Sequence, residues 1–295
     1  MEVNIIGLKI NSRIEMPENN DQSIPIRIAE YLKAALIASD SASEILMGKF
    51  SSVNPVIQGM GLSAWKKSPG ELVTEADLES DKSIKSALSG IHSQGDIYSE
   101  EGFLENGGGK YSWLVDPLCG TTCYASGLAT FGISISLLGP NGTLILGVIT
   151  MPSIKERLTT VVNKSVTRNG RPWLPTGPKS ELNNTLIGVS VGGSWGNVGK
   201  SFTWAAETGG IISFGSAPYS LFHLAAGHLG GQLFFNAGVE HIAAGAAVCQ
   251  QLGLKVTDTL GRNIVWEVNK TYETVLISWP QYYDQLIALF AKDTI

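Results

Sequence analysis

The stretch SWLVDPLCGTTCYASG, residues 112–127, constrains the fold more than any other part of the chain. The apolar run from Trp113 to Val115, ended by Asp116-Pro117, predicts a buried strand. The Gly-Thr-Thr triplet at 120–122 predicts a turn into a short helix, whose first N–H groups have no intrahelical partner and face any anion placed there. Cys119 lies between the strand and the turn. The motif therefore places an acid, a thiol and a potential anion-binding turn at one strand end.

This motif resembles the Asp-Pro-Ile/Leu-Asp-Gly-Thr-Thr motif of the inositol monophosphatase family, with one acid exchanged for Cys119. Three further stretches match family motifs in order and spacing: VTEAD at 73–77, SEE at 99–101 and GVEHIAAG at 238–245. The resemblance covers about residues 25 to 290. It implies an α/β protein with the inositol-monophosphatase-like layered αβαβα fold, in which helices lie between and outside mixed sheets. It also implies a homodimer.

The chain is expected to form two packed halves, since 295 residues are enough for a substantial core. We predict an N-terminal extension at 1–22, an α+β half carrying the site motifs at 23–168, and an α/β half at 180–295. Proline and glycine interrupt regular structure between the halves. The apolar periodicity predicts a long first helix from Pro25 to Met47, a hairpin around Pro140 to Gly142 and a helix from His241 to Leu252. Short strands are expected around Lys255, Ile264 and Val275.

Charge and cysteine content limit the location and the partners. A net charge of −5 and a pI near 5.4 argue against nucleic-acid binding, which calls for a basic face. The longest apolar region, 131–150, is broken by Gly-Pro-Asn-Gly, so no membrane span is expected. The three cysteines form an odd, sparse set that suits a reducing, cytoplasmic location. Cys123 and Cys249 are interpreted as packing residues, and His223 and His228 as structural histidines.

The resemblance implies a magnesium-dependent phosphatase whose ligands are acids. By position, the residues that match the family's first-metal ligands are the carboxylates Glu100 and Asp116 and the backbone carbonyl of Leu118. Asp77 matches an acid lining a further metal site, and Thr121 matches a threonine that positions the attacking water. The two second-metal acids are replaced by Cys119 and His241.

This exchange shapes the functional hypothesis. Two residues that hold one ion must be neighbours, so Cys119 and His241 are expected to lie close together. A soft sulfur and an imidazole are unfavourable ligands for magnesium. The sequence therefore predicts that the metal site is lost and that no metal cofactor is needed.

The preferred hypothesis is a metal-independent, cysteine-dependent acyl-transfer enzyme. Cys119 would be the nucleophile and His241 the base, with Asp116 or Glu100 orienting the imidazole. The oxyanion hole would come from backbone N–H groups of Gly120, Thr121 and Thr122. The reaction would be hydrolysis, transfer or cyclisation of an apolar acyl group on a small molecule or a carrier.

The predicted substrate pocket contains Phe234 and Glu240. Phe234 stands where the family has an acid that contacts inositol hydroxyls, and Glu240 replaces the family's tryptophan. Two alternatives stay open. One is a Mg- or Zn-dependent phosphomonoesterase with an altered second metal site, and the other is a catalytically silent binder of small molecules.

Overall fold

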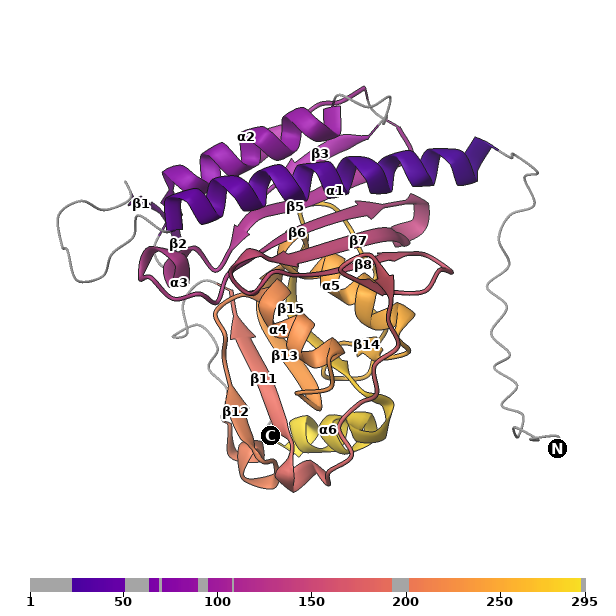
Figure 1. Ribbon diagram of the computed structural model, residues 1–295. Helices are drawn as coiled ribbons and strands as arrows, with labels where there is room; N and C mark the ends of the chain where they lie inside the picture. Colours follow the sequence, from indigo (N-terminus) through magenta and orange to yellow (C-terminus); the bar gives the residue numbers. More distant parts are fainter. Residues whose placement is uncertain are drawn as a thin grey trace.

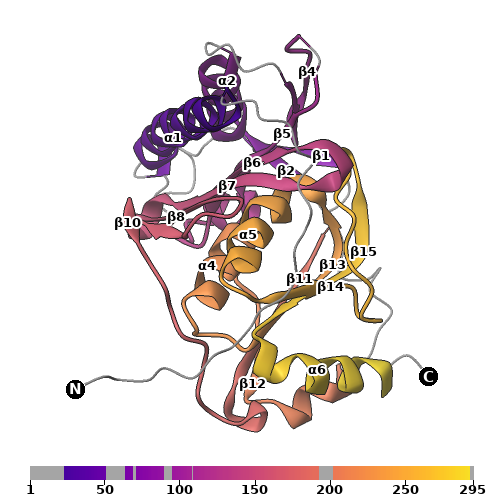
Figure 2. The same ribbon diagram turned by 90° about the vertical axis from the view of Figure 1, so that its right-hand side faces the viewer.

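The computed structural model describes residues 23–50, 64–68, 71–89, 95–107, 109–192 and 202–292. Helices and sheets alternate in layers (Figure 1). The outer layer is formed by α1 (Ser23–Phe50) and α2 (Glu75–Ser89), and an eight-stranded sheet lies beneath it. Next come α4 (Ala217–Ala225) and α5 (Val239–Gln251), a five-stranded sheet, and α6 (Pro280–Lys292) (Figure 2). The predicted αβαβα layering is confirmed.

The eight-stranded sheet has the order β10-β9-β8-β7-β6-β5-β3-β4. Its strands are β3 (Asp96–Ser99), β4 (Gly102–Leu104), β5 (Ser112–Cys119), β6 (Gly132–Leu138), β7 (Leu144–Met151), β8 (Glu156–Val161), β9 (Thr167–Arg168) and β10 (Arg171–Pro172). The predicted hairpin is confirmed, because β6 and β7 pair antiparallel across the 3-10 turn Pro140–Gly142. β3 and β5 are parallel, so their carboxyl ends lie at the same edge.

The five-stranded sheet has the order β12-β11-β13-β15-β14. Its strands are β11 (Leu186–Val191), β12 (Gly210–Ile212), β13 (Gly231–Gly238), β14 (Lys255–Thr257) and β15 (Thr271–Ser278). The strand predicted around Ile264 is wrong, because that segment contributes only an isolated bridge between Asn263 and Thr257. A separate antiparallel pair is formed by β1 (Ala64–Ser68) and β2 (Glu71–Thr74).

Small residues let α5 lie close against the large sheet. Ala243, Ala244 and Gly245 are buried, and a Cβ on Gly147 of β7 would lie 2.4 Å from the carbonyl oxygen of Ala244. Such an approach is possible only without a side chain at position 147. Ser134 of β6 adds a hydrogen bond of 2.8 Å from its hydroxyl to the carbonyl of Glu240. The first turn of α5 is therefore fixed above the end of β5.

The predicted division into two halves stays a prediction. One hydrophobic cluster joins the two sheets, since it contains Leu114 and Ile149 of the large sheet together with Leu233 and Val275 of the small one. The predicted extension at 1–22 lies outside the described residues. Among the described helices, none combines the length and apolar character that crossing a membrane requires.

Candidate active site

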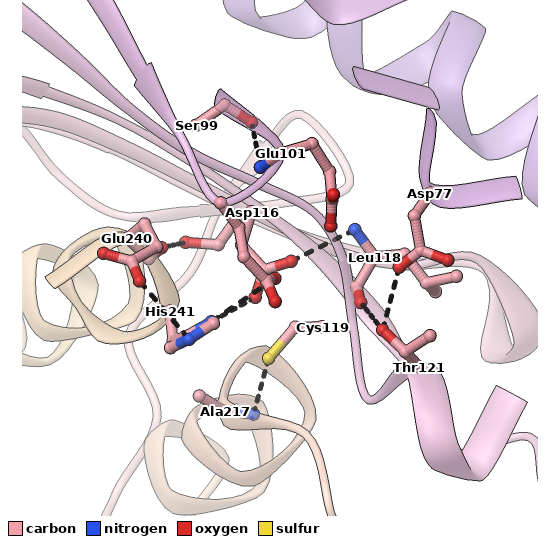
Figure 3. Close-up of polar contacts among 12 residues, drawn as sticks. Asp77, Ser99, Glu101, Asp116, Leu118, Cys119, Thr121, Ala217, Glu240 and His241 are labelled. Atoms are coloured by element: carbon pink, nitrogen blue, oxygen red, sulfur yellow. Dashed lines mark hydrogen bonds and ion pairs between the residues drawn. The ribbon is translucent and has the colours of Figure 1, made fainter. Parts of the chain in front are cut away.

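Several elements from different parts of the chain carry the site residues predicted from the sequence. Asp116, Leu118 and Cys119 lie at the end of β5, Asp77 in the first turn of α2, and His241 in the first turn of α5. Glu100 follows β3, and its N–H donates to the carbonyl of Val115 at 3.0 Å. Of the predicted anion-binding residues, Gly120 is the N-cap of α3 (Thr121–Ala125), and Thr121 and Thr122 are its first two residues. Figure 3 shows that residues from α2, β5 and α5 converge.

Asp77 and Thr121 form a buried polar pair. Asp77 is 1% exposed, and its Oδ1 accepts a hydrogen bond of 2.8 Å from the Thr121 hydroxyl. Its Oδ2 accepts hydrogen bonds from the N–H and the hydroxyl of Thr74. Burial raises the pKa of Asp77 to about 6, although these hydrogen bonds act in the opposite direction. The Thr121 oxygen also lies 3.0 Å from the carbonyl oxygen of Leu118.

His241 is held between carboxylates. Its Nδ1 lies 2.5 Å from Oδ2 of the fully buried Asp116 and 3.9 Å from Oε2 of Glu100. Its Nε2 lies 3.4 Å from Oε1 of Glu240. Burial alone would lower the pKa of His241, but the charge and the hydrogen bond of Asp116 raise it well above the ordinary value. Asp116 therefore favours the protonated form of the ring.

Cys119 is 8% exposed, and its Sγ accepts a hydrogen bond of 3.3 Å from the N–H of Ala217. Burial, followed by the charge of Asp116, raises the pKa of the Cys119 thiol to about 12, despite the opposing effects of His241 and Ala217. One donor atom each from Asp116, Cys119 and His241 lies within 4.8 Å of the others. The structure thus brings Cys119 and His241 together, with the thiol protonated.

A cavity of about 420 Å³ opens beside these residues. Its lining includes Glu100, Cys119, His241 and residues 120–122. Phe234 also lines the cavity, although it is only 1% exposed. Glu240 is not among the lining residues, and its carboxylate lies beside His241 (Figure 3). Of the two predicted pocket residues, therefore, only Phe234 lines the cavity. Gly120 turns the chain into α3 with φ +97°, and a Cβ there would lie 2.9 Å from the carbonyl oxygen of Thr130.

The sequence did not predict that the start of α4 belongs to the site. Ser216 and Ala217 line the cavity, and Ala217 contacts Cys119 directly. A serine followed by a proline at 218 is a helix-start signal, but nothing in it indicates which strand end the helix meets.

The histidines and cysteines that the sequence analysis interpreted as structural or packing residues contact other parts of the protein. His223 and His228 lie with their Nδ1 atoms 2.8 Å apart. Cys249 is fully buried in α5. Cys123 lines the cavity, and its thiol donates to the carbonyl of Phe214 at 3.6 Å.

Comparison with known proteins decides the family. The model of the inositol monophosphatase family matches residues 28–293. The chain belongs to this family. It is 32% identical over 203 residues to the inositol-1-monophosphatase of Mesorhizobium japonicum, a match that covers 66% of this chain and 75% of the relative.

Solved structures agree on the fold. The extragenic suppressor protein suhB of Bartonella henselae matches with a TM-score of 0.77 and 24% identity, covering 88% of this chain and 98% of the other. A structure described as an IMPase/NADP phosphatase complexed with Mg2+ and phosphate matches with a TM-score of 0.71 and 16% identity, covering 91% and 95%.

These findings correct the functional hypothesis. Membership of a phosphatase family confirms the expectation of an enzyme, but the metal-independent acyl-transfer enzyme is wrong. The cysteine nucleophile, the cyclase alternative, the loss of the metal site and the absence of a cofactor are wrong with it. The physical reason lies in the protonation of the pair. Burial raises the pKa of the Cys119 thiol to about 12, which disfavours the thiolate. Asp116 raises the pKa of His241 and so favours the protonated ring, a form that cannot accept a proton from the thiol.

The donor atoms divide into two sets when tested against magnesium. Carboxylates of Glu100 and Asp116 and the carbonyl of Leu118 are hard oxygen donors at neighbouring strand ends, and they fit Mg²⁺. The sulfur of Cys119 and the imidazole of His241 do not fit it. The donor types that the resemblance implies for the first metal position are therefore present, and those that it implies for the second are replaced.

Proposed function

We propose that the protein is a magnesium-dependent phosphomonoesterase. The observation that carries the proposal is the placement of the oxygen donors at the ends of β3 and β5. The carboxylates of Glu100 and Asp116 lie 3.9 Å and 2.5 Å from the same atom, Nδ1 of His241. The carbonyl oxygen of Leu118 lies 3.0 Å from the Thr121 hydroxyl, which is hydrogen-bonded to Asp77. Glu100, Asp116 and the Leu118 carbonyl would hold Mg²⁺. When bound, the ion supplies charge to a phosphoryl oxygen and lowers the pKa of a bound water.

The chain's own groups would orient the reactants. The Thr121 hydroxyl donates its proton to Asp77, so its oxygen is left to accept a hydrogen bond from a water in the cavity. Asp77 is ionised above about pH 6 and can take up a proton passed through Thr121. Thr121 and Thr122 line the same cavity, and the first N–H groups of α3 lack intrahelical partners, so they would hold the phosphate oxygens.

The leaving group would occupy the apolar part of the cavity, beside Phe234 and Ile242. A volume of about 420 Å³ suits a small molecule. A small-molecule substrate, the absence of nucleic-acid partners and a homodimer remain predictions. The described cysteines are all free, which supports the predicted cytoplasmic location.

The test is phosphate release from inositol 1-phosphate and from an aryl phosphate. We expect activity with Mg²⁺ that a chelator removes and fresh Mg²⁺ restores. Thr121→Ala should lower kcat by about 100-fold or more, in the range of lost proton-transfer groups. Thr208→Ala is the matched control, since its buried hydroxyl donates to the carbonyl of Ala205 at 2.9 Å and does not line the cavity. Equal activity of the two variants, or hydrolysis that persists in chelator, would refute the proposal.

A further inference from the structure

We propose that Cys119, His241 and Asp116 bind a thiophilic divalent ion of the zinc class next to the oxygen site. The proposal deepens the proposed function. It rests on that function only in expecting a substrate phosphate beside the ion. Glu240 is assigned as the residue that positions His241 for this ion.

The first argument is geometric. The three donor atoms lie within 4.8 Å of one another, although they come from β5 and from the first turn of α5 (Figure 3). Zinc bonds of about 2.0–2.3 Å place the donors of a tetrahedral site about 3.3–3.8 Å apart. Asp116 and His241, now 2.5 Å apart, must therefore separate by about 1 Å when an ion replaces the proton between them. The His241 side chain is 28% exposed and faces the cavity, which leaves room for this movement.

The second argument is the chemistry of the donors. One sulfur, one imidazole nitrogen and one carboxylate oxygen form a set that zinc accepts and magnesium does not. Exchange of two hard oxygen ligands for Cys119 and His241 therefore changes the preferred ion and keeps three potential ligands.

The third argument is that neighbouring groups already hold each ligand. Glu240 lies 3.4 Å from Nε2 of His241, so the ring can donate there and direct Nδ1 toward the ion. A carboxylate on the far nitrogen is typical of metal-binding histidines. The N–H of Leu118 donates to Oδ1 of Asp116 at 3.1 Å, and the N–H of Ala217 donates to the sulfur of Cys119 at 3.3 Å. These contacts orient all three ligands.

The fourth coordination position would face the cavity, which both Cys119 and His241 line. Glu100 also lines it and lies 3.9 Å from Nδ1 of His241. Three protein ligands with one open position are typical of catalytic rather than structural zinc sites. A water or a phosphate oxygen could complete the coordination beside the start of α3.

The test uses metal-free full-length protein titrated with Co²⁺, followed by competition with Zn²⁺ in a calorimeter. We expect a thiolate-to-cobalt charge-transfer band that Zn²⁺ abolishes. Cys119→Ser should remove the band and weaken Zn²⁺ binding by at least about 100-fold, while Glu240→Gln should keep the band and weaken binding by about 10–100-fold. Cys123→Ser is the matched control, because this second thiol also lines the cavity, and it should retain both band and affinity.

Three results would overturn the proposal: no band in the wild type, a band lost with Cys123 instead of Cys119, or Zn²⁺ affinity unchanged in a Cys119→Ser variant whose circular dichroism matches the wild type. Combined Cys119→Asp and His241→Asp substitution should remove the band and raise Mg²⁺ affinity. Phosphate release is measured on the same samples. A cobalt band without hydrolysis contradicts only the proposed function, and magnesium-dependent hydrolysis without the band contradicts only this inference.

Discussion

Replacing Asp77 with asparagine should remove one pH-dependent contribution to the stability of the metal-free protein. In the wild type the side chain is 1% exposed, and burial raises its pKa from 3.8 to about 6. The folded state then holds the proton more tightly than the unfolded state. Stability due to this group is present below pH 3.8 and is lost as pH rises through 6.

The size of the effect follows from the shift. Each pKa unit corresponds to 1.36 kcal/mol, so a wild-type protein taken from pH 4 to pH 7.5 should lose about 2 kcal/mol through Asp77 alone. Asparagine carries no titratable proton and can still accept the hydrogen bond from Thr121. The difference between the two proteins in free energy of unfolding should therefore change by about 2 kcal/mol over this range.

Urea unfolding of metal-free protein at pH 4, 5, 6 and 7.5 measures this difference. Asp258→Asn is the control, because hydrogen bonds from Arg262 and Leu260 lower the pKa of Asp258 despite its partial burial. A lowered pKa gives stability that is lost only below the unfolded value, so this variant should follow the wild-type slope above pH 4. If Asp77→Asn also runs parallel to the wild type, the burial argument for Asp77 is wrong.

Two further predictions concern packing and burial. Gly147→Ala should lower the free energy of unfolding by about 1–3 kcal/mol, because its Cβ would meet the Ala244 carbonyl of α5 at 2.4 Å. Gly48→Ala should be neutral or stabilising in the same urea titration, because among the described residues no atom beyond its chain neighbours and its own helix backbone lies within 4 Å of an added Cβ. Tyr124→Phe should lower the free energy of unfolding by about 1–3 kcal/mol, because the buried carbonyl of Leu46 loses its 2.6 Å hydrogen bond from the tyrosine hydroxyl. Tyr283→Phe is the control and should cost less, because the Tyr283 hydroxyl donates to Thr257 at 3.0 Å in a partly exposed position. Equal losses within either pair would contradict the reasoning.

The layered fold was predictable because its signals are local. The turn at 140–142 between two alternating runs was enough to predict the β6–β7 hairpin. The strand at Ile264 failed because strand formation needs a partner, and Val265 beside it is 62% exposed. Helix α6 begins with Pro280, a start signal present in the sequence that the prediction did not use.

Which residues form the site was easier to predict than their protonation states. Motif positions alone indicated that Cys119 and His241 would meet. A thiol at the start of a helix suggested a thiolate, but the pKa depends on burial and on Asp116, which only the folded structure sets. The contact between Glu240 and His241 was also hidden, since consecutive helical residues usually point in different directions.

Asp116 explains how the altered site remains compatible with the fold. A fully buried carboxylate is costly unless it is paired, and the imidazole of His241, whose protonated form Asp116 favours, is a hydrogen-bonding partner at 2.5 Å. The other oxygen of Asp116 is satisfied by the N–H of Leu118. The protein can therefore keep this acid buried without an ion, and an ion bound by Cys119 and His241 must displace the proton between Asp116 and the imidazole. Asp116 thus belongs to both proposed metal positions, which makes them energetically coupled.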